Sequence, residues 1–264
     1  MSDPHDPAAA MAAAAQAVPP APAPVCTVTR RRAVLAGVAG VFAGAAAAEA
    51  ANLLSGGRSP APVSRQAPPD VDLMEEHGVL KRVLLIYEEA VSRLGSGGAP
   101  AGVVVAAVHD GAEVIHDFIE SFHEALEEGY VFPRLRNAGV LVSTVDTLLV
   151  QHGRGRQLTQ LILEGSNLSA MRSSTVRGAV SRSMSAFARM YQPHEAREDT
   201  VVFPAFRSML DAHELEDLAA TFAALQAHQF GKDAFGAVVE RVANIERSLG
   251  IYDLNQFTPP ATTS

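Results

Sequence analysis

Two stretches of the chain carry nearly the same sequence, HEALEEGYVFP at residues 123–133 and HEAREDTVVFP at residues 194–204. They agree at seven of eleven positions, with an offset of 71 residues. A weaker repeat, His-Gly, occurs at residues 77–78 and 152–153, with an offset of 75. The elements therefore follow one another in the order His, His-x-x-x-Glu, His, His-x-x-x-Glu. This internal repeat predicts two helical hairpins related by a pseudo-two-fold axis.

The sequence around this repeat has the periodicity of helices from Asp70 onward, without a sustained run of alternating β-branched residues. Four long helices with short connections predict an all-α fold, an antiparallel up-down four-helix bundle over residues 70–210. Residues 211–264 are expected to add one C-terminal helix on the outside and, from about Asn255, a loose tail. The five expected helices cover about residues 71–94, 101–136, 140–163, 174–210 and 215–249.

Three prolines, Pro133, Pro193 and Pro204, lie inside or at the ends of these predicted helices. Proline has no backbone N–H, and its ring clashes with a carbonyl one turn earlier. Each proline is therefore expected to kink or stop its helix, and two of them close the repeated motif.

The repeat places an imidazole and a carboxylate one helical turn apart, His123 with Glu127 and His194 with Glu198. Residues i and i+4 lie on one face of a helix, so each pair points toward the same region. If the two single histidines lie at the same depth, the interior holds four imidazoles and two carboxylates. This donor set without thiolate is typical of a pair of non-haem iron or manganese ions. Without a metal, so many buried polar groups would be costly.

The other histidines carry weaker signals. A lone histidine on a helix is more often a surface or hydrogen-bonded residue than a ligand, so His109, His213 and His228 are expected to be ordinary residues. His116 lies seven residues before His123, on nearly the same helix face. It is a candidate spare ligand or supporting partner, although its position alone favours neither role.

A ferritin-like site is the main competing metal geometry, and it uses Glu-x-x-His on each of two helices. The chain matches this pattern at residues 113–116 and 120–123. Both matches lie on one predicted helix, so the His-x-x-x-Glu order fits better.

In order, spacing and flanking sequence, the repeated set with its Val-Phe-Pro ends resembles the hemerythrin-like HHE cation-binding domain over about residues 70–210. That family holds an oxo- or hydroxo-bridged pair of non-haem iron ions inside a four-helix bundle. The resemblance implies that Glu127 and Glu198 bridge two iron ions and that the four repeat histidines are terminal ligands. Glu124 matches a position that supplies an extra carboxylate ligand in some members. The implied metal-site residues are His77, His123, Glu124, Glu127, His152, His194 and Glu198.

The chain departs from the oxygen-carrying hemerythrins at two positions. The carriers have two histidines one turn apart on the third helix, whereas here Leu148 and Arg156 flank His152. Their carboxylate on the fourth helix is an aspartate five residues after the histidine, whereas Glu198 follows His194 by four. A site with one histidine fewer is expected to be more open or richer in carboxylate. Simple reversible oxygen carriage is therefore disfavoured relative to chemistry or sensing of oxygen, nitric oxide or peroxide.

Three functions are compatible with a site of this kind. The first is a module that binds O2 or another small diatomic ligand at an open iron position, as a carrier or a sensor. The second is an enzyme that acts on peroxide or nitric oxide, and the third is an iron-handling bundle. The sequence has no nucleotide fingerprint and no Ser/His/Asp arrangement, so a metal- and ligand-binding protein is favoured over an enzyme. The oligomeric state is left open.

The N-terminal region has the composition of a targeting segment. Arg30-Arg31-Arg32 precedes an apolar run at residues 33–48 that ends in an A-x-A-like site, which is typical of a secretory signal. The paired arginines resemble the twin-arginine (Tat) signal, so export to the periplasm through transient contact with the Tat machinery is expected. The alternatives are an uncleaved inner-membrane anchor and a start site placed too early. Residues 1–50 are assigned to this segment and residues 51–69 to a linker.

Charge and cysteine content exclude several classes of function. The whole chain has a net charge of −8, and residues 1–69 carry five arginines and three acids, so the remainder carries −10. An acidic region is a poor candidate for nucleic-acid binding, which needs clustered Lys and Arg. Cys26 is the single cysteine, which excludes an intramolecular disulfide framework, a thiolate zinc site and a CxxC redox pair.

Overall fold

Apolar residues at three- and four-residue spacing form one face of helix α3, Pro69–Gly95, in the computed structural model. Leu73, Leu80 and Tyr87 lie on that face and are at most 1% exposed. The structure describes residues 67–95, 100–231 and 234–261, and within these ranges it contains helices and no strand. The predicted all-α class is therefore confirmed for this part of the chain. The predicted export segment and most of the predicted linker lie outside the described residues.

Three further helical segments follow α3 and agree with the predicted helices to within a few residues. The second segment continues through α4 (Gly102–Val114), η1 (Ile115–His123), α5 (Glu124–Leu126), η2 (Glu127–Val131) and α6 (Phe132–Asn137). The third is α7 (Val142–Gly165), followed by a short 3-10 turn, η3 (Ala170–Arg172). The fourth consists of α8 (Ser174–Arg197), η4 (Glu198–Val202) and α9 (Phe203–Ser208).

The repeat prolines do not stop their helices, so of the two expected outcomes, a kink or a stop, the stop does not occur. A five-residue π turn, η2 or η4, ends just before each Phe-Pro pair. The N–H of Phe132 bonds to the carbonyl of Glu127, five residues earlier, and Phe203 bonds to Glu198 in the same way. This wider winding lets the chain pass a residue that lacks an N–H without ending the helix. Pro193 lies inside α8, which continues to Arg197.

The prediction of a single C-terminal helix after residue 211 is wrong, because two helices occupy that region. Helix α10 covers Ala212–Phe230 and α11 covers Ala234–Leu249. The break follows from Gly231, whose φ of 90° lies in the left-handed region that favours glycine. The tail expected to be loose from Asn255 contains a short 3-10 turn, η5 (Leu254–Phe257).

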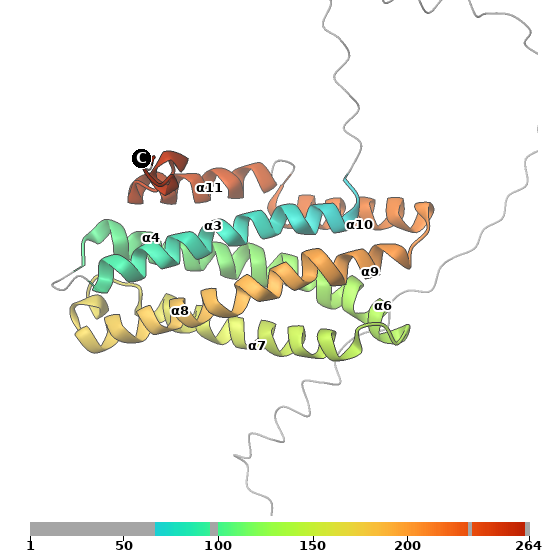
Figure 1. Cartoon of the computed structure of the whole chain (residues 1–264), viewed down its shortest axis with the longest axis horizontal. Helices are drawn as coiled ribbons and strands as arrows, with labels where there is room; N and C mark the ends of the chain where they lie inside the picture. The colour runs from blue at the N-terminus through green and yellow to red at the C-terminus, as the bar shows by residue number, and fades with distance from the viewer. Residues whose placement is uncertain (1–66, 96–99, 232–233, 262–264) are drawn as a thin grey trace, which may run out of the picture. The chain divides into compact units, whose positions relative to one another are not determined.

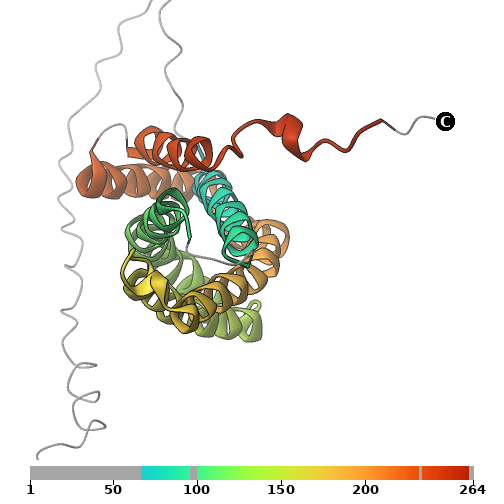
Figure 2. The same cartoon turned by 90° about the vertical axis from the view of Figure 1, so that its left-hand side faces the viewer.

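The helices pack side by side around a shared interior. Helix α3 contacts α4 and α8, and α7 contacts the same two helices, so the four segments enclose the interior (Figure 1). Both C-terminal helices contact α3, and α11 also contacts α4, which places them on one side of this group (Figure 2). The described residues therefore form an all-helical, bundle-like fold.

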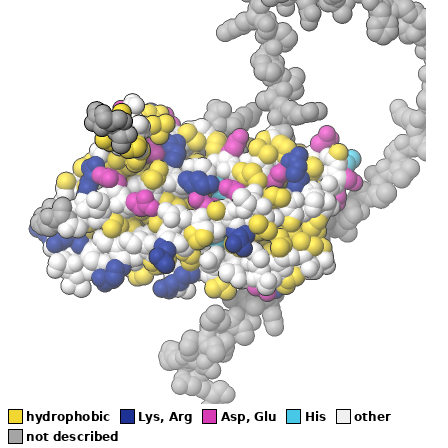
Figure 3. Space-filling model, viewed as in Figure 1, with side chains coloured by type: hydrophobic (Ala, Val, Ile, Leu, Met, Phe, Trp, Pro, Cys, Tyr) yellow, Lys and Arg dark blue, Asp and Glu magenta, His cyan; other side chains and the backbone are white. Residues whose placement is uncertain are grey.

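Large aromatic side chains fill much of the interior, and the surface is a mixture of apolar, charged and other atoms. The largest side chains that are at most 1% exposed include five phenylalanines, Phe118, Phe132, Phe187, Phe203 and Phe206. On the face shown in Figure 3, acidic and basic side chains are interspersed and histidine occupies little of the surface. Among the described helices, none is long and apolar enough to cross a membrane.

Candidate metal centre

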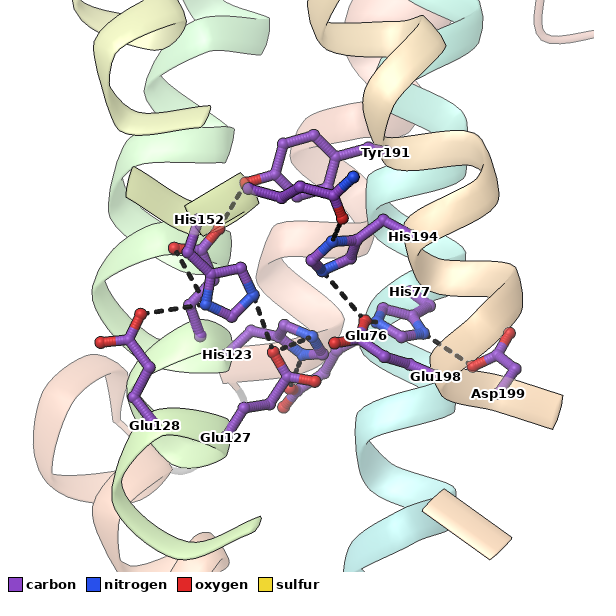
Figure 4. Close-up of polar contacts among 12 residues, drawn as sticks. Glu76, His77, His123, Glu127, Glu128, His152, Tyr191, His194, Glu198 and Asp199 are labelled. Atoms are coloured by element: carbon purple, nitrogen blue, oxygen red, sulfur yellow. Dashed lines mark hydrogen bonds and ion pairs between the residues drawn. The ribbon is translucent and has the colours of Figure 1, made fainter. Parts of the chain in front are cut away.

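Six side chains of the repeat converge in the middle of the bundle, and each is at most 3% exposed (Figure 4). They form two groups in which the candidate ligand atoms lie within 4.8 Å of one another. We call these groups the His77 cluster, made of His77, His123 and Glu127, and the His152 cluster, made of His152, His194 and Glu198. All six residues that the repeat singled out are therefore brought together.

Glu198 lies between the two clusters. Its Oε2 atom is 3.2 Å from Nε2 of His194, which belongs to its own cluster. The same oxygen is 3.4 Å from Nε2 of His77, which belongs to the other cluster. The carboxylate of Glu198 thus faces one imidazole of each cluster.

Glu127 occupies the equivalent position on the opposite side. Its Oε2 atom is 3.6 Å from Nε2 of His123 and 3.4 Å from Nε2 of His152. Both glutamates therefore lie between the two clusters, each within 3.6 Å of an imidazole nitrogen of either cluster. Each is also the first residue of a π turn, and π turns inside helices occur frequently at functional sites.

Each of the four imidazoles bonds a side chain of another helical segment through its other nitrogen, Nδ1. These bonds are 2.7–2.9 Å long. They fix the orientation of each ring and leave Nε2 directed at the glutamates. The pairs are His77 with Asp199, His123 with Glu76, His152 with Glu128, and His194 with Gln151.

The sequence analysis did not identify these four partners, although the repeat contains a signal for them. Each partner is the immediate neighbour in sequence of another site residue. Glu76 and Gln151 precede the two single histidines, and Glu128 and Asp199 follow the two glutamates of the motif. The repeat offsets of 75 and 71 residues therefore extend to the supporting side chains as well.

The Val-Phe-Pro end of the motif contributes an aromatic wall to each half of the site. Phe203 stacks on His77 with ring centroids 5.4 Å apart, and Phe132 stacks on His152 at 5.5 Å. Both phenylalanines are at most 1% exposed. Each motif thus supplies a glutamate and, five residues later, a phenylalanine whose ring packs on a histidine of another helix.

Glu124, the extra carboxylate implied by the family resemblance, lies beside the site rather than between the clusters. Its Oε1 atom accepts a 2.6 Å hydrogen bond from the hydroxyl of Tyr191. Its Oε2 atom forms an ion pair with Arg156 at 2.7 Å and lies 4.0 Å from the outer nitrogen, Nδ1, of His152. Glu124 forms a third candidate cation group with Glu128 and His152.

A basic side chain closes each half of the site on the outside. Lys81 and Arg156 each follow a single histidine of the repeat by four residues. Lys81 pairs with Asp199, which bonds His77, and with Glu195. Arg156 pairs with Glu128, which bonds His152, and with Glu124. The distances are 3.1 and 4.0 Å from Lys81 to Asp199 and Glu195, and 2.6 and 2.7 Å from Arg156 to Glu128 and Glu124.

The electrostatics of the site couple its imidazoles to its carboxylates. Burial by itself lowers the pKa of His77, but the hydrogen bond to Asp199 and the nearby carboxylate of Glu198 outweigh burial and raise this pKa to about 10. The pKa of His152 also rises to about 10, because the nearby carboxylate of Glu127 and the hydrogen bond to Glu128 outweigh burial. Burial raises the pKa of Glu198, but His194 and His77 outweigh it and hold this pKa well below its usual range.

The atoms that face the centre have unsatisfied bonding capacity. Nε2 of His77, Nε2 of His152 and both carboxylate oxygens of Glu127 and Glu198 are buried without a hydrogen-bond partner among the described residues. Unpaired polar atoms in a protein interior are costly and rare. Cations placed between these atoms would supply the missing partners, so the donor set fits metal ions.

The other four histidines among residues 67–261 that the structure describes lie outside both clusters. The side chain of His116 is 55% exposed and bonds Glu120, so the structure does not bring it to the site. His109 bonds Ser166, and His213 and His228 are exposed, as expected for ordinary residues. The competing ferritin-like pattern is not favoured, because the side chain of its first glutamate, Glu113, is 42% exposed and pairs with Arg241.

Fold and site together define a helical, bundle-like protein whose buried His/Glu clusters can hold metal ions. The chain belongs to the same protein family as uncharacterized protein Rv1995 of Mycobacterium tuberculosis (strain H37Rv) and uncharacterized protein Mb2018 of Mycobacterium bovis. It is 49% identical to each over 189 residues, which cover 71% of this chain and 72% of the relative. No family model matches the chain. No solved structure matches it.

Proposed function

We propose that this protein is a hemerythrin-like, antiparallel four-helix bundle that holds two iron ions and binds or responds to O2 or a related small ligand, such as nitric oxide or peroxide. The observation that carries the proposal is the position of the two glutamates. The Oε2 atoms of Glu127 and Glu198 each lie within 3.6 Å of an imidazole nitrogen from both clusters. A single-ion site would not need two carboxylates that each span two histidine pairs.

The proposed ligand set follows from this geometry. His77 and His123 would hold one ion, His152 and His194 the other, and the glutamates would bridge the two. Imidazole and carboxylate donors without a thiolate suit iron or manganese. The iron ions, when bound, supply redox-active positions at which a small molecule can coordinate. Four imidazoles and two bridging carboxylates would not fill the coordination shells of two ions, so positions would remain free for such a molecule.

Side chains around the clusters have distinct roles in this proposal. The hydrogen bonds to Nδ1 hold each imidazole in one tautomer and one orientation. Phe132 and Phe203 exclude water from the centre. On α7, the positions one turn either side of His152 carry Leu148 and Arg156, and neither supplies a further imidazole. The His152 cluster therefore offers two histidines and no third.

Metal analysis of the purified full chain tests the proposal directly. We expect about two iron ions per chain. The variant His194→Ala is expected to lose at least one ion, because Nε2 of His194 faces Glu198. The control His213→Ala removes a histidine that is 84% exposed and is expected to keep both ions. An iron content well below one per chain, without loss during purification, would overturn the di-iron assignment.

Spectroscopy and turnover separate the proposed ligand binder from an enzyme or an iron-handling bundle. A reversible change in the optical spectrum of the reduced protein on exposure to air or nitric oxide supports ligand binding. Sustained turnover of peroxide that is lost in Glu127→Ala would replace this proposal with an enzyme. Iron that loads and leaves without any ligand-dependent spectral change would replace it with an iron-handling bundle.

A further inference from the structure

The two halves of the site differ in one of the side chains that support their histidines. In the His77 cluster, both imidazoles bond carboxylates, because Asp199 accepts from His77 and Glu76 accepts from His123. In the His152 cluster, His152 bonds a carboxylate, but His194 bonds the neutral amide of Gln151, at 2.8 Å. Glu76 and Gln151 occupy equivalent positions of the repeat.

Four pairs of charged residues in and around the clusters are matched between the two halves. The equivalent pairs are Glu127 with Glu198, Glu128 with Asp199, Glu124 with Glu195, and Lys81 with Arg156. Glu120 and Tyr191 are also equivalent and differ in charge, but neither hydrogen-bonds one of the four site imidazoles.

The two halves also differ in what covers them. A pocket of about 270 Å³ lies over Glu76, and α10 and α11 form part of its wall through Phe222 and Phe235. A pocket of about 360 Å³ lies at the equivalent place over Gln151, and its lining includes Thr147, Arg197 and His194 itself. Neither C-terminal helix contributes to the lining of this second pocket. The second pocket therefore reaches a candidate ligand directly, whereas the first reaches only a supporting side chain.

We propose that the two metal positions are unequal, and that the His152 cluster holds its ion more weakly and exchanges it through the pocket at Gln151. This inference rests on the proposed function. An imidazole whose Nδ1–H donates a hydrogen bond to a carboxylate is a better electron donor to a metal than one whose Nδ1–H donates to a neutral amide. Changes in such supporting partners alter metal affinity by about 10–100-fold. The same cluster is then the position at which a small external ligand reaches the centre.

Titration of the metal-free full chain with Co²⁺ tests the inequality, because this ion is coloured and stable in air. The wild-type protein is expected to bind two ions in two steps whose dissociation constants differ by about tenfold or more. Gln151→Glu is expected to tighten the weaker step by about tenfold and to narrow the gap. Glu76→Gln is expected to weaken the stronger step instead. Gln157→Glu, an exposed change on the same helix, is the charge-matched control and should alter neither step.

Access through the pocket is measured by the rate at which a chelator removes the more weakly held Co²⁺. Thr147→Trp fills the pocket and is expected to slow this removal several-fold. Val150→Trp is the matched control, because Val150 is 71% exposed on the same helix and lies outside the pocket lining. An unchanged rate in Thr147→Trp would overturn the proposed route.

Failure of this inference can be told apart from failure of the proposed function. A wild-type protein that binds no Co²⁺, or a single ion, contradicts the two-metal site itself. Two ions bound with equal affinity, or a Gln151→Glu variant that leaves the weaker step unchanged, contradicts only the inequality. Circular dichroism confirms that each variant keeps its helices. If Glu76→Gln does not fold, Gln151→Glu decides the question alone, since Gln151 is only partly buried.

Discussion

The hydroxyl of Tyr191 donates a 2.6 Å hydrogen bond to Oε1 of Glu124, and both side chains are 1% exposed. The ring of Tyr191 also lies 5.0 Å from that of His194, so this phenol connects a buried carboxyl to the His152 cluster. Burial raises the pKa of Glu124, and the charge of His152 and the bond from Tyr191 oppose this rise without cancelling it. Glu124 therefore depends on a small number of partners for its stability in the interior.

Replacing Tyr191 with phenylalanine is expected to destabilise the protein, because it leaves Oε1 of Glu124 buried without a donor. The expected loss in the free energy of unfolding is about 1–3 kcal/mol, measured by urea denaturation. Tyr252→Phe is the control, because Tyr252 is 50% exposed and the change is chemically the same. Equal stability of the two variants would show that the bond contributes nothing measurable.

Gly155→Ala is expected to disturb the same tyrosine from the opposite helix. A Cβ atom at position 155 would lie 2.9 Å from two ring carbons of Tyr191 and closer still to its hydroxyl, so the ring must move. We expect a loss of about 1–3 kcal/mol in unfolding free energy, as for overpacking elsewhere. Gly153→Ala on the same helix meets nothing within 4 Å and is expected to stabilise by up to about 1 kcal/mol. A similar response of both variants would contradict the close packing.

Asp72 predicts a pH dependence of stability that is separate from the metal ligands. Burial, followed by the charges of Glu76, Glu75 and Asp70, raises the pKa of this carboxyl from 3.8 to about 7. Below pH 3.8 the group is protonated in both the folded and the unfolded state and has no effect on stability. Between pH 3.8 and about 7 the folded state binds the proton more tightly, so rising pH lowers stability until the loss is complete above about pH 7.

Asp72→Asn is therefore expected to stabilise the protein at pH 8 and to change little near pH 4. Because Asp72 is only half-buried, we expect a gain of about 1 kcal/mol at pH 8 rather than the full value that the pKa shift implies. Urea denaturation at the two pH values measures the difference. Glu216→Gln, at an exposed position on α10, is the control. A gain at pH 4 equal to that at pH 8 would show that the effect is not electrostatic.

The sequence identified the six residues of the two clusters because their positions depend on local rules. An i, i+4 spacing puts His123 and Glu127 on one helix face in any helix, and the repeat then predicts the same for the second motif. Which side chain bonds each Nδ1 atom depends instead on the axial register between neighbouring helices. Sequence periodicity does not determine that register, so the pairing of Glu76 with His123 was not predictable from spacing alone.

The C-terminal region shows a second limit of sequence patterns. Apolar residues continue at helical spacing on both sides of Gly231, so the pattern predicted one helix over residues 215–249. A glycine inside a helical pattern is usually tolerated at a modest cost. Here the chain turns at Gly231 because α10 and α11 both pack on α3, a tertiary preference that outweighs local periodicity.

Docking of α11 on α3 predicts a stability effect at one ion pair. Arg82 on α3 forms a two-bond pair with Glu246 on α11, with N···O distances of 2.9 and 2.6 Å. Glu246→Ala leaves a partly buried guanidinium without this partner. We expect a loss of about 1–3 kcal/mol, below the cost for a fully buried pair, because Arg82 is 26% exposed. Faster amide hydrogen exchange confined to residues 234–249 would locate the loss, and unchanged exchange there would contradict this docking contact.

Removal of metal is expected to destabilise the protein, because the clusters would then keep their buried nitrogens and oxygens unpaired. Binding that occurs only in the folded state adds about 2.7 kcal/mol when the free ion is at one hundred times its dissociation constant. For a folded region of this size, that corresponds to a drop of about 5–10 °C in the thermal midpoint after chelation. Differential scanning calorimetry of iron-loaded and chelator-treated protein measures this drop. His194→Ala should show a smaller difference between the two conditions than the wild type, whereas His213→Ala should respond like the wild type, because its side chain is 84% exposed. A thermal midpoint that is independent of metal in the wild-type protein would mean that the unpaired atoms of the two clusters are not satisfied by an ion.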